Sequence, residues 1–235
     1  MTTSNALDSE WYHSHDGKHH LSNLIDPLKK ERIIFRLLQR PNPKNVKVRW
    51  KQFKVLVCNI GHGNSASTLI NRLVGDDCNN VYSGFVMKQM FWPIYDAGEI
   101  SYFQIQLWEL PGLLSESNVY TKDAFSSVDC ILLSTRFSNQ AFLSNIKSAS
   151  DVAAQKFVDI NGRKSLVPPI IAISSLLTSM EQCHLSASDL EAMGETPFFW
   201  VDCQTNKTKP LDQLLGISEI MSFICNELHC RNKSL

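Results

Sequence analysis

The chain has 235 residues, of which 43% are hydrophobic and 20% are charged. This length suits one domain of about 180 residues with an appendage, because single hydrophobic cores stop growing at roughly 250–300 residues. No apolar run approaches the roughly 18 residues of a membrane span, and the first 20 residues contain no apolar signal core. We therefore expect a cytoplasmic protein that is neither secreted nor embedded in a membrane.

The formal charge is zero, with 23 basic and 23 acidic side chains, but the charge is unevenly distributed. Between Pro27 and Lys54 there are ten Lys or Arg residues and one acid, Glu31. This surplus leaves the rest of the chain at about minus nine. The basic segment either meets acidic lipid headgroups or an acidic partner surface, or is a solvated helix face followed by a linker. We expect no nucleic-acid partner.

Cysteine and histidine patterns do not favour a metal site. The seven cysteines are scattered without a C-x-x-C pair, so we interpret them as reduced and mostly buried thiols. The histidines at positions 13, 15, 19 and 20 lie in a polar leader without cysteines or paired carboxylates at ligand spacing. Cys230 is the sixth residue from the end and not the fourth, so the prenylation pattern is absent and we expect no lipid anchor.

Residues 1–50 are predicted to form an N-terminal extension, and residues 51–235 a single domain. Within the extension, apolar residues recur at three- and four-residue spacings over residues 21–39, which predicts an amphipathic basic helix. Pro41 and Pro43 end that helix and begin a short basic linker. This helix either packs on the domain or docks on a partner.

The most informative stretch is residues 54–76, which indicates a buried strand, a glycine-containing turn and an amphipathic helix. A phosphate-binding loop has the pattern G-x-x-x-x-G-K-[ST], in which amides and a helix N-terminus surround phosphates, Lys neutralises them and the hydroxyl reaches Mg²⁺. This chain has Cys58 at the first Gly and Asn64 at the Lys. The retained or adjacent positions of a vestigial nucleotide site are Gly61, Gly63, Asn64, Ser65 and Ala66.

Two interpretations of this loop remain open. It is a phosphate cradle that lost its fixed positive charge, with Ser65 as the Mg²⁺ ligand if the metal binds. Alternatively, its glycines only let the chain turn and Ser65 caps the helix. Loss of the Lys removes a charge-assisted contact of about 1.5–3 kcal/mol. We therefore expect no cofactor, and GTP or GDP with Mg²⁺ only if nucleotide binding persists.

From residue 53 onward, two kinds of segment alternate. Short apolar runs typical of strands in a parallel sheet lie at 53–57, 130–134, 169–173 and 198–202. Helical periods lie at 65–74, about 139–157, 186–193 and about 211–228. Residues 86–94 and 100–108 flank a turn and predict an antiparallel hairpin. We therefore predict an α/β fold with a Ras-like G domain, whose six-stranded, mostly parallel sheet is flanked by helices.

The other nucleotide signatures of such a domain are degenerate. The pattern W-D-x-x-G-Q is represented by Trp108, Glu109 and Gly112, but Leu113 replaces the Gln that positions the attacking water. Leucine can neither donate to nor accept from water, so we expect no catalytic residue and no hydrolysis by the standard route. After the fifth strand, residues 174–177 read Ser-Ser-Leu-Leu, without the carboxylate that reads guanine.

Aromatic residues are concentrated on or beside the hairpin. Alternate members must face the core, and those that face outward would form an apolar strip for partner recognition. The partner-binding residues that we predict are Tyr82, Phe85, Phe91, Trp92, Trp108 and Leu113.

The chain resembles the Rem- and Rab-similar small GTPases of the ciliogenesis and planar polarity effector complex. The resemblance is carried by Glu10-Trp11-Tyr-His-Ser-His-Asp-Gly17-Lys18, by the basic helix ending Leu38-Gln-Arg40-Pro41, and by Phe91-Trp92-Pro93. It implies a Rab-like protein that works at basal bodies with Fuzzy, Inturned and Fritz-type proteins in cilium assembly, vesicle targeting and planar cell polarity. It also implies switch regions at about 79–88 and 109–120, which longin-type partners would engage.

Measured against that family, the chain departs at the nucleotide contacts. The family's Gly-Lys-Thr is Gly63-Asn64-Ser65, its Mg²⁺-binding Thr aligns with Tyr82, and its guanine-contacting Asp aligns with Leu177. The leading hypothesis is a non-catalytic, pseudoGTPase adaptor. The alternatives are a weakly GTP-binding Rab-like switch in the same pathway and a Ras-like scaffold unrelated to cilia.

Overall fold

The protein is described by a computed structural model that covers residues 48–61, 65–74, 86–96, 99–114, 119–136, 141–176, 195–202 and 210–233. Its strands are β1 (Val48–Asn59), β2 (Met87–Asp96), β3 (Glu99–Leu113), β4 (Cys130–Arg136), β5 (Ile170–Leu176) and β6 (Phe198–Asp202). Its helices are α2 (Ser65–Val74), α3 (Thr121–Phe125), α4 (Ala141–Asn161) and α6 (Pro210–Lys233).

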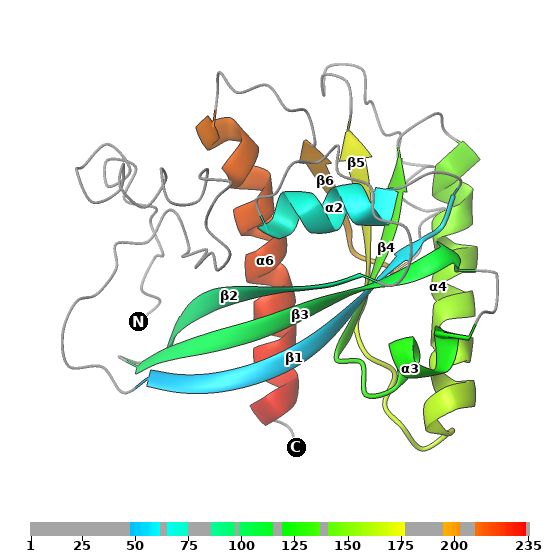
Figure 1. Ribbon diagram of the computed structural model, residues 1–235, viewed down its shortest axis with the longest axis horizontal. Coiled ribbons are helices and arrows are strands. Elements are labelled where there is room, and N and C mark those ends of the chain that lie inside the picture. The colour runs from blue at the N-terminus through cyan, green and yellow to red at the C-terminus, as the bar shows by residue number, and fades with distance from the viewer. Residues whose placement is uncertain are drawn as a thin grey trace.

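All six strands form one sheet in the order β2-β3-β1-β4-β5-β6. The β2–β3 pair is antiparallel, with Met87 opposite Trp108, and every other pair is parallel. Figure 1 shows α6 and α4 on opposite sides of this sheet. The α/β prediction is confirmed, because this strand order and the single antiparallel hairpin are the topology of a Ras-like G domain.

Successive side chains of β1 point to opposite faces of the sheet, and each face carries its own hydrophobic core. Val55 and Val57 face the core that contains α2 and α6, whereas Leu56 and Cys58 face the core that contains α3 and α4. All four side chains are fully buried. Each buried Leu, Ile or Val contributes about 1.5–3 kcal/mol by leaving water, so burial on both faces holds the helices to the sheet.

Most predicted elements are confirmed with small shifts. Residues 65–74 and 198–202 have the predicted bounds, and the strands predicted at 130–134 and 169–173 are β4 and β5. The helices predicted at about 139–157 and 211–228 end four or five residues later. The helix predicted at 186–193 and the N-terminal extension before residue 48 lie outside the described residues.

Two parts of the fold differ from the sequence prediction. Strand β1 begins at Val48, five residues before the predicted start, and it pairs with β3 from there. The basic side chains of this segment concealed the strand in the sequence. Helix α3 has only five residues, too few to produce a helical period. Among the described residues, no helix is both long and apolar enough to cross a membrane.

Helix α4 ends at a glycine with a left-handed backbone. Gly162 has a φ of 91°, and its N–H donates to the Val158 carbonyl at 2.8 Å. Asn161, the last residue of the helix, donates through Nδ2 to the Phe125 carbonyl at 2.9 Å. The turn therefore ties the end of α4 to α3.

We predict that Gly162→Ala lowers the free energy of unfolding by about 1–2 kcal/mol, because a Cβ disfavours positive φ. An added Cβ would meet no atom within 4 Å, so the loss comes from the backbone alone. Urea unfolding measures it. Gly61→Ala is the control: among the described residues its Cβ would meet only Thr135 Oγ1, at 3.8 Å, so we expect a change below about 0.5 kcal/mol. Equal losses would contradict this account.

Candidate functional site

The candidate site lies where the carboxyl ends of β1, β3 and β4 meet the N-terminus of α2 (Figure 1). On the sheet face that packs against α2, buried apolar residues recur at every second position along these strands. Toward the carboxyl end of each strand, a buried polar residue takes the next such position: Asn59 of β1, Glu109 of β3 and Ser134 of β4. Asn59 and Ser134 are directly paired in the sheet, and Glu109 pairs with Val57. The sheet therefore brings these three side chains to the start of one helix.

The Asn59 side chain occupies the N-terminus of α2. Its Oδ1 accepts hydrogen bonds from the Ser65 hydroxyl and from the Ala66 backbone N–H, each at 2.8 Å. The amide orientation follows from the second bond, because an N–H can donate only to the oxygen. All three residues are buried, and the carboxamide satisfies a helix N–H that would otherwise be available to an anion.

Ser134 supports the same helix start through its backbone. Its carbonyl accepts from the Ile60 N–H and lies 3.1 Å from the Ser65 hydroxyl. The Ser65 hydroxyl therefore has two acceptor oxygens within reach, Asn59 Oδ1 at 2.8 Å and the Ser134 carbonyl at 3.1 Å. The Ser134 Oγ itself is fully buried and has no hydrogen-bond partner among the described residues.

Glu109 is the acid of this site, and it is only 7% exposed. Its Oε1 accepts from the Ser67 hydroxyl at 2.6 Å, whereas Oε2 has no hydrogen-bond partner in the described structure. Burial raises the pKa of this carboxyl, and the Ser67 hydrogen bond and the nearby Lys88 ammonium oppose the rise. Lys88 Nζ itself donates to Asn71 Oδ1 at 2.6 Å.

The other predicted nucleotide residues are only partly described. Gly61 ends the described part of the loop, while Gly63 and Asn64 lie outside the described residues. Gly112 lies within β3, which continues through Leu113. Ser65, Ala66 and Glu109 are therefore the predicted positions that the structure places together. The Ser174 hydroxyl, near the predicted guanine-reading position, is buried without a described partner, and Leu177 is outside the described residues.

Of the predicted partner-binding residues, Trp108 is the one whose side chain is described. Lys54 Nζ lies 4.0 Å from its ring centroid, so the ring is covered by a cation and is only partly exposed. Phe91, Trp92 and Leu113 are placed by their backbones in β2 and β3, and Tyr82 and Phe85 lie outside the described residues. Phe103, another hairpin aromatic, is fully buried and belongs to the core.

Sequence reasoning missed the apolar residues that the structure exposes beside the predicted switches. Met87, at the start of β2, is 48% exposed, and Val119 and Tyr120, just before α3, are 83% and 45% exposed. The sequence does not identify them, because a single apolar residue outside a periodic pattern does not show whether it faces the core or water. Asn59 was also missed, since a capping residue is normally adjacent to its helix and this one is six residues away.

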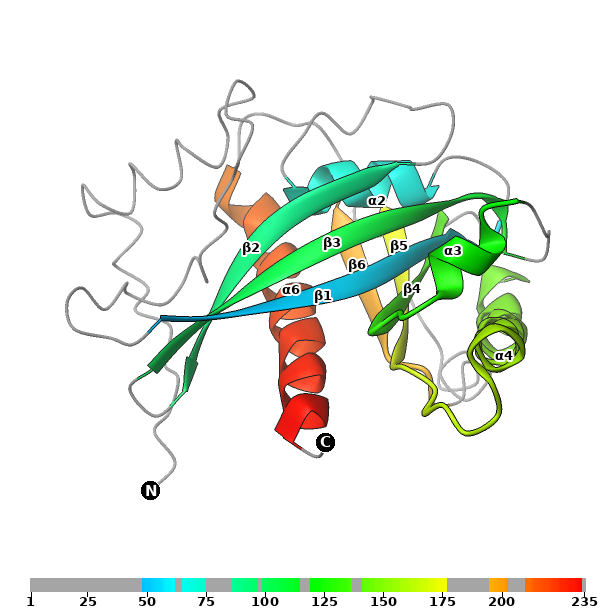
Figure 2. The ribbon, with the colours of Figure 1, turned by 60° about the horizontal axis from the view of Figure 1, so that its bottom comes forward.

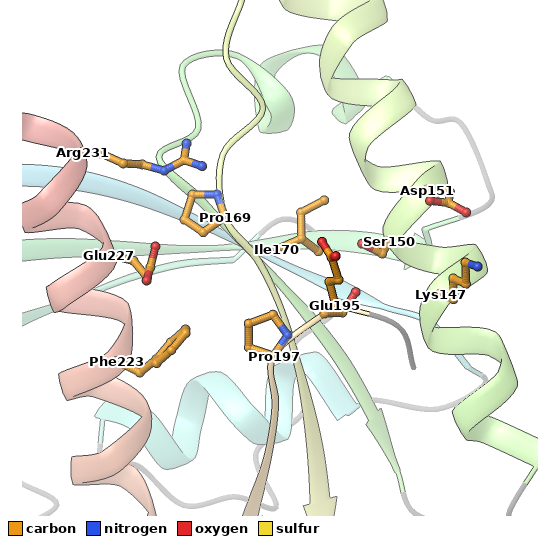
Figure 3. A pocket seen from close by; sticks show the side chains of 11 residues that line it. Lys147, Ser150, Asp151, Pro169, Ile170, Glu195, Pro197, Phe223, Glu227 and Arg231 are labelled. Carbon is orange, nitrogen blue, oxygen red and sulfur yellow. The ribbon is translucent and has the colours of Figure 1, made fainter. Parts of the chain in front are cut away.

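Two hollows border the described structure. The smaller, of about 180 Å³, lies beside the candidate site on the α4 side and is lined by Asn59, Ile60, Leu114 and residues of α4. The larger, of about 660 Å³, lies between α4 and α6 at the amino ends of β5 and β6 (Figure 3). Its walls carry both signs of charge, with Lys147 and Asp151 on α4 and Glu227 and Arg231 on α6. It is at the opposite end of the strands from the candidate site.

The described residues include no group of three or more His, Cys, Asp or Glu that could hold a metal ion. Cys58, Cys130 and Cys225 are buried thiols, and Cys230 is exposed. Burial raises the pKa of Cys58 and Cys130. These three buried cysteines therefore act as small apolar core residues.

A scan of the chain against protein-family models found no match, and a search of curated proteins found no significant relative. The fold defines the chain as an α/β protein with Ras-like G-domain topology.

We predict that Glu109→Gln stabilises the protein at pH 8 by roughly 1 kcal/mol, because a neutral amide costs less to bury than a carboxylate. The folded-state pKa of Glu109 lies above its unfolded value, so the free energy of unfolding falls as pH rises from about 4.3 through the folded-state pKa. The variant should flatten this slope in urea unfolding between pH 4 and 8.

Glu195→Gln is the matched control: Glu195 is exposed, so we expect its replacement to change the free energy of unfolding by less than about 0.5 kcal/mol. A Glu109→Gln protein that is less stable at pH 8, with the original slope, would show that the buried carboxylate is ionised and stabilising.

Proposed function

We propose that this protein is a non-catalytic small-GTPase-like subunit of the ciliogenesis and planar polarity effector complex. In this role it acts as an adaptor in the cytoplasm, at the basal body or cilium base. It binds Fuzzy, Inturned and Fritz-type proteins and thereby supports cilium assembly, vesicle targeting and planar cell polarity. The G-domain fold serves as a fixed protein-binding scaffold and not as a nucleotide-driven switch.

The observation that carries the non-catalytic part of the proposal is the contact between Asn59 and the N-terminus of α2. In a phosphate-binding loop the helix N–H groups donate to phosphate. Here the Ala66 N–H donates to Asn59 Oδ1 at 2.8 Å instead, and the Ser65 hydroxyl donates to neutral oxygens of the protein. An incoming phosphate would have to displace an internal bond without a loop Lys to compensate for that loss.

The sequence also lacks residues that would contact the nucleotide at three separate positions. Asn64 replaces the charge-neutralising Lys, Leu113 the water-positioning Gln, and Leu177 the guanine-reading Asp. These positions serve binding, hydrolysis and base selection respectively, so one compensating change could not restore all three. A protein-binding role needs only the surfaces of the domain, so it accounts for a fold that is retained without these contacts.

The ciliary part of the proposal is supported by the sequence resemblance, which extends beyond the G domain. Its signatures are the leader from Glu10 to Lys18, the basic helix ending at Arg40, and Phe91-Trp92-Pro93 in β2. The exposed Met87, Val119 and Tyr120 lie in the segments that correspond to the two switches, which is where longin-type partners would bind. Exposed apolar side chains of this size favour a protein partner.

A second candidate function is a weakly GTP-binding Rab-like switch in the same pathway. It is favoured by the convergence of Ser65, Ser67 and Glu109, because hydroxyls and a carboxylate are the ligands that Mg²⁺ and its waters prefer. Glu109 Oε2, which has no hydrogen-bond partner among the described residues, is the atom that such a water would use. In this case partner contacts or the basic extension would have to replace the missing Lys.

We predict that the purified protein carries no stoichiometric guanine nucleotide and that Mg²⁺·GTP leaves its thermal unfolding unchanged. A ligand at a hundredfold excess over its Kd would add about 2.7 kcal/mol, which differential scanning fluorimetry detects. Asn64→Lys, which restores only the loop charge, should also show no shift, because Asn59 still occupies the helix N-terminus. A nucleotide-dependent shift in the natural chain would support the switch instead.

We also predict that Tyr120→Asp or Met87→Asp weakens co-purification with Fuzzy and Inturned homologues by at least tenfold, because a charge would replace an apolar contact in the interface. Leu166→Asp is the matched control: Leu166 is 76% exposed and lies in the loop after α4, outside both predicted switch segments. No association of the natural chain, even with all complex members co-expressed, would contradict the ciliary assignment.

A further inference from the structure

Part of β1 has no neighbouring strand on one side among the described residues, because β1 extends well beyond its neighbour β4. Strand β1 pairs with β3 from Val48 onward, whereas its pairing with β4 begins at Val55. Lys54, just before that point, donates its N–H to Asp129 Oδ2 at 2.8 Å, and its carbonyl accepts from the Asp129 N–H at 2.9 Å. No described strand lies along the preceding segment Val48–Phe53, which we call the β1 edge (Figures 1 and 2).

The bonds of Lys54 define which backbone groups face outward. Both of its backbone groups point away from β3, toward the side that β4 occupies farther along. Because backbone groups alternate in direction along a strand, the N–H and C=O groups of Gln52, Trp50 and Val48 point to the same side. Three successive outward pairs are a template for the hydrogen bonds of an added strand.

The charge of this edge selects among the possible occupants. The sequence from Lys47 to Lys51 is Lys-Val-Arg-Trp-Lys, and it contains no acid. The Lys51 side chain is partly exposed and has no polar partner among the described residues, and the neighbouring Gln52 is exposed. Asp123 and Asp129, in contrast, interact electrostatically with Lys54, which lies at the inner end of the edge.

A second copy of the chain does not fit this edge. Two β1 edges that paired with one another would place basic side chains opposite basic side chains, which destabilises a strand pair. Lysine at an edge is a known means of preventing such self-association. An acidic extended segment has the complementary charge and the same backbone hydrogen-bonding pattern.

We propose that the β1 edge binds an extended acidic segment of a partner protein, which adds to the sheet as a strand beside β1. This site does not depend on the nucleotide loop or on the proposed switch contacts. Asn59 lies seven positions after Gln52, about 23 Å along a strand, so the two surfaces can be occupied independently.

The test uses the full chain and a synthetic probe, the capped peptide Glu-Val-Glu-Val-Glu-Val, at low ionic strength. Residue-resolved amide hydrogen exchange should show the outward N–H groups of Trp50 and Gln52 unprotected without the peptide, while those of Lys51 and Phe53 are protected. Addition of the peptide should slow exchange of the two outward amides by at least tenfold. The matched peptide Lys-Val-Lys-Val-Lys-Val should protect neither.

Two variants separate binding from folding. Gln52→Pro removes an outward donor but no β1–β3 bond, so it should abolish protection by the peptide and retain the fold by circular dichroism. Lys51→Glu should weaken peptide binding by about threefold to tenfold. The proposal is overturned if the outward amides are already protected in the chain alone, if both peptides bind equally, or if the chain pairs with itself at this edge.

Discussion

The site depends on one side chain, the carboxamide of Asn59, which occupies the N-terminus of α2. Its Oδ1 is held by the Ala66 N–H and the Ser65 hydroxyl, and the strand pairing of Asn59 with Ser134 fixes its position. A helix cap of this kind contributes about 1 kcal/mol. The same bonds that stabilise the start of α2 engage a helix N–H that would otherwise be available to an anion.

The rest of the structure keeps this contact in place. Strand β1 is central, and its apolar residues are buried against helices on both faces of the sheet. On the side away from β3, Lys54 bonds through its backbone to Asp129, and its ammonium donates to the carbonyls of Asp123 and Ser126 while covering Trp108. These contacts hold β1 in place from both faces of the sheet and from its β4 side.

The sequence predicts the sheet well, because the apolar run of the buried strand at 130–134 and the helical period at 65–74 are strong signals. It fails at β1, where charged residues on an exposed edge look like a linker, and at α3, which is too short to have a period. In the site, Ser65, Ala66 and Glu109 follow from motif spacing. Asn59 does not, because its role arises only when β1 and β4 align at the start of α2.

The most direct test of the central claim is hydrogen exchange at the Ala66 amide. In the natural chain without nucleotide this N–H should be protected, since it donates to Asn59 and is fully buried with its residue. The protection should be unchanged by Mg²⁺·GTP and should fall sharply in Asn59→Ala. An Ala66 amide that exchanges freely in the free protein and becomes protected only when nucleotide is added would contradict the account.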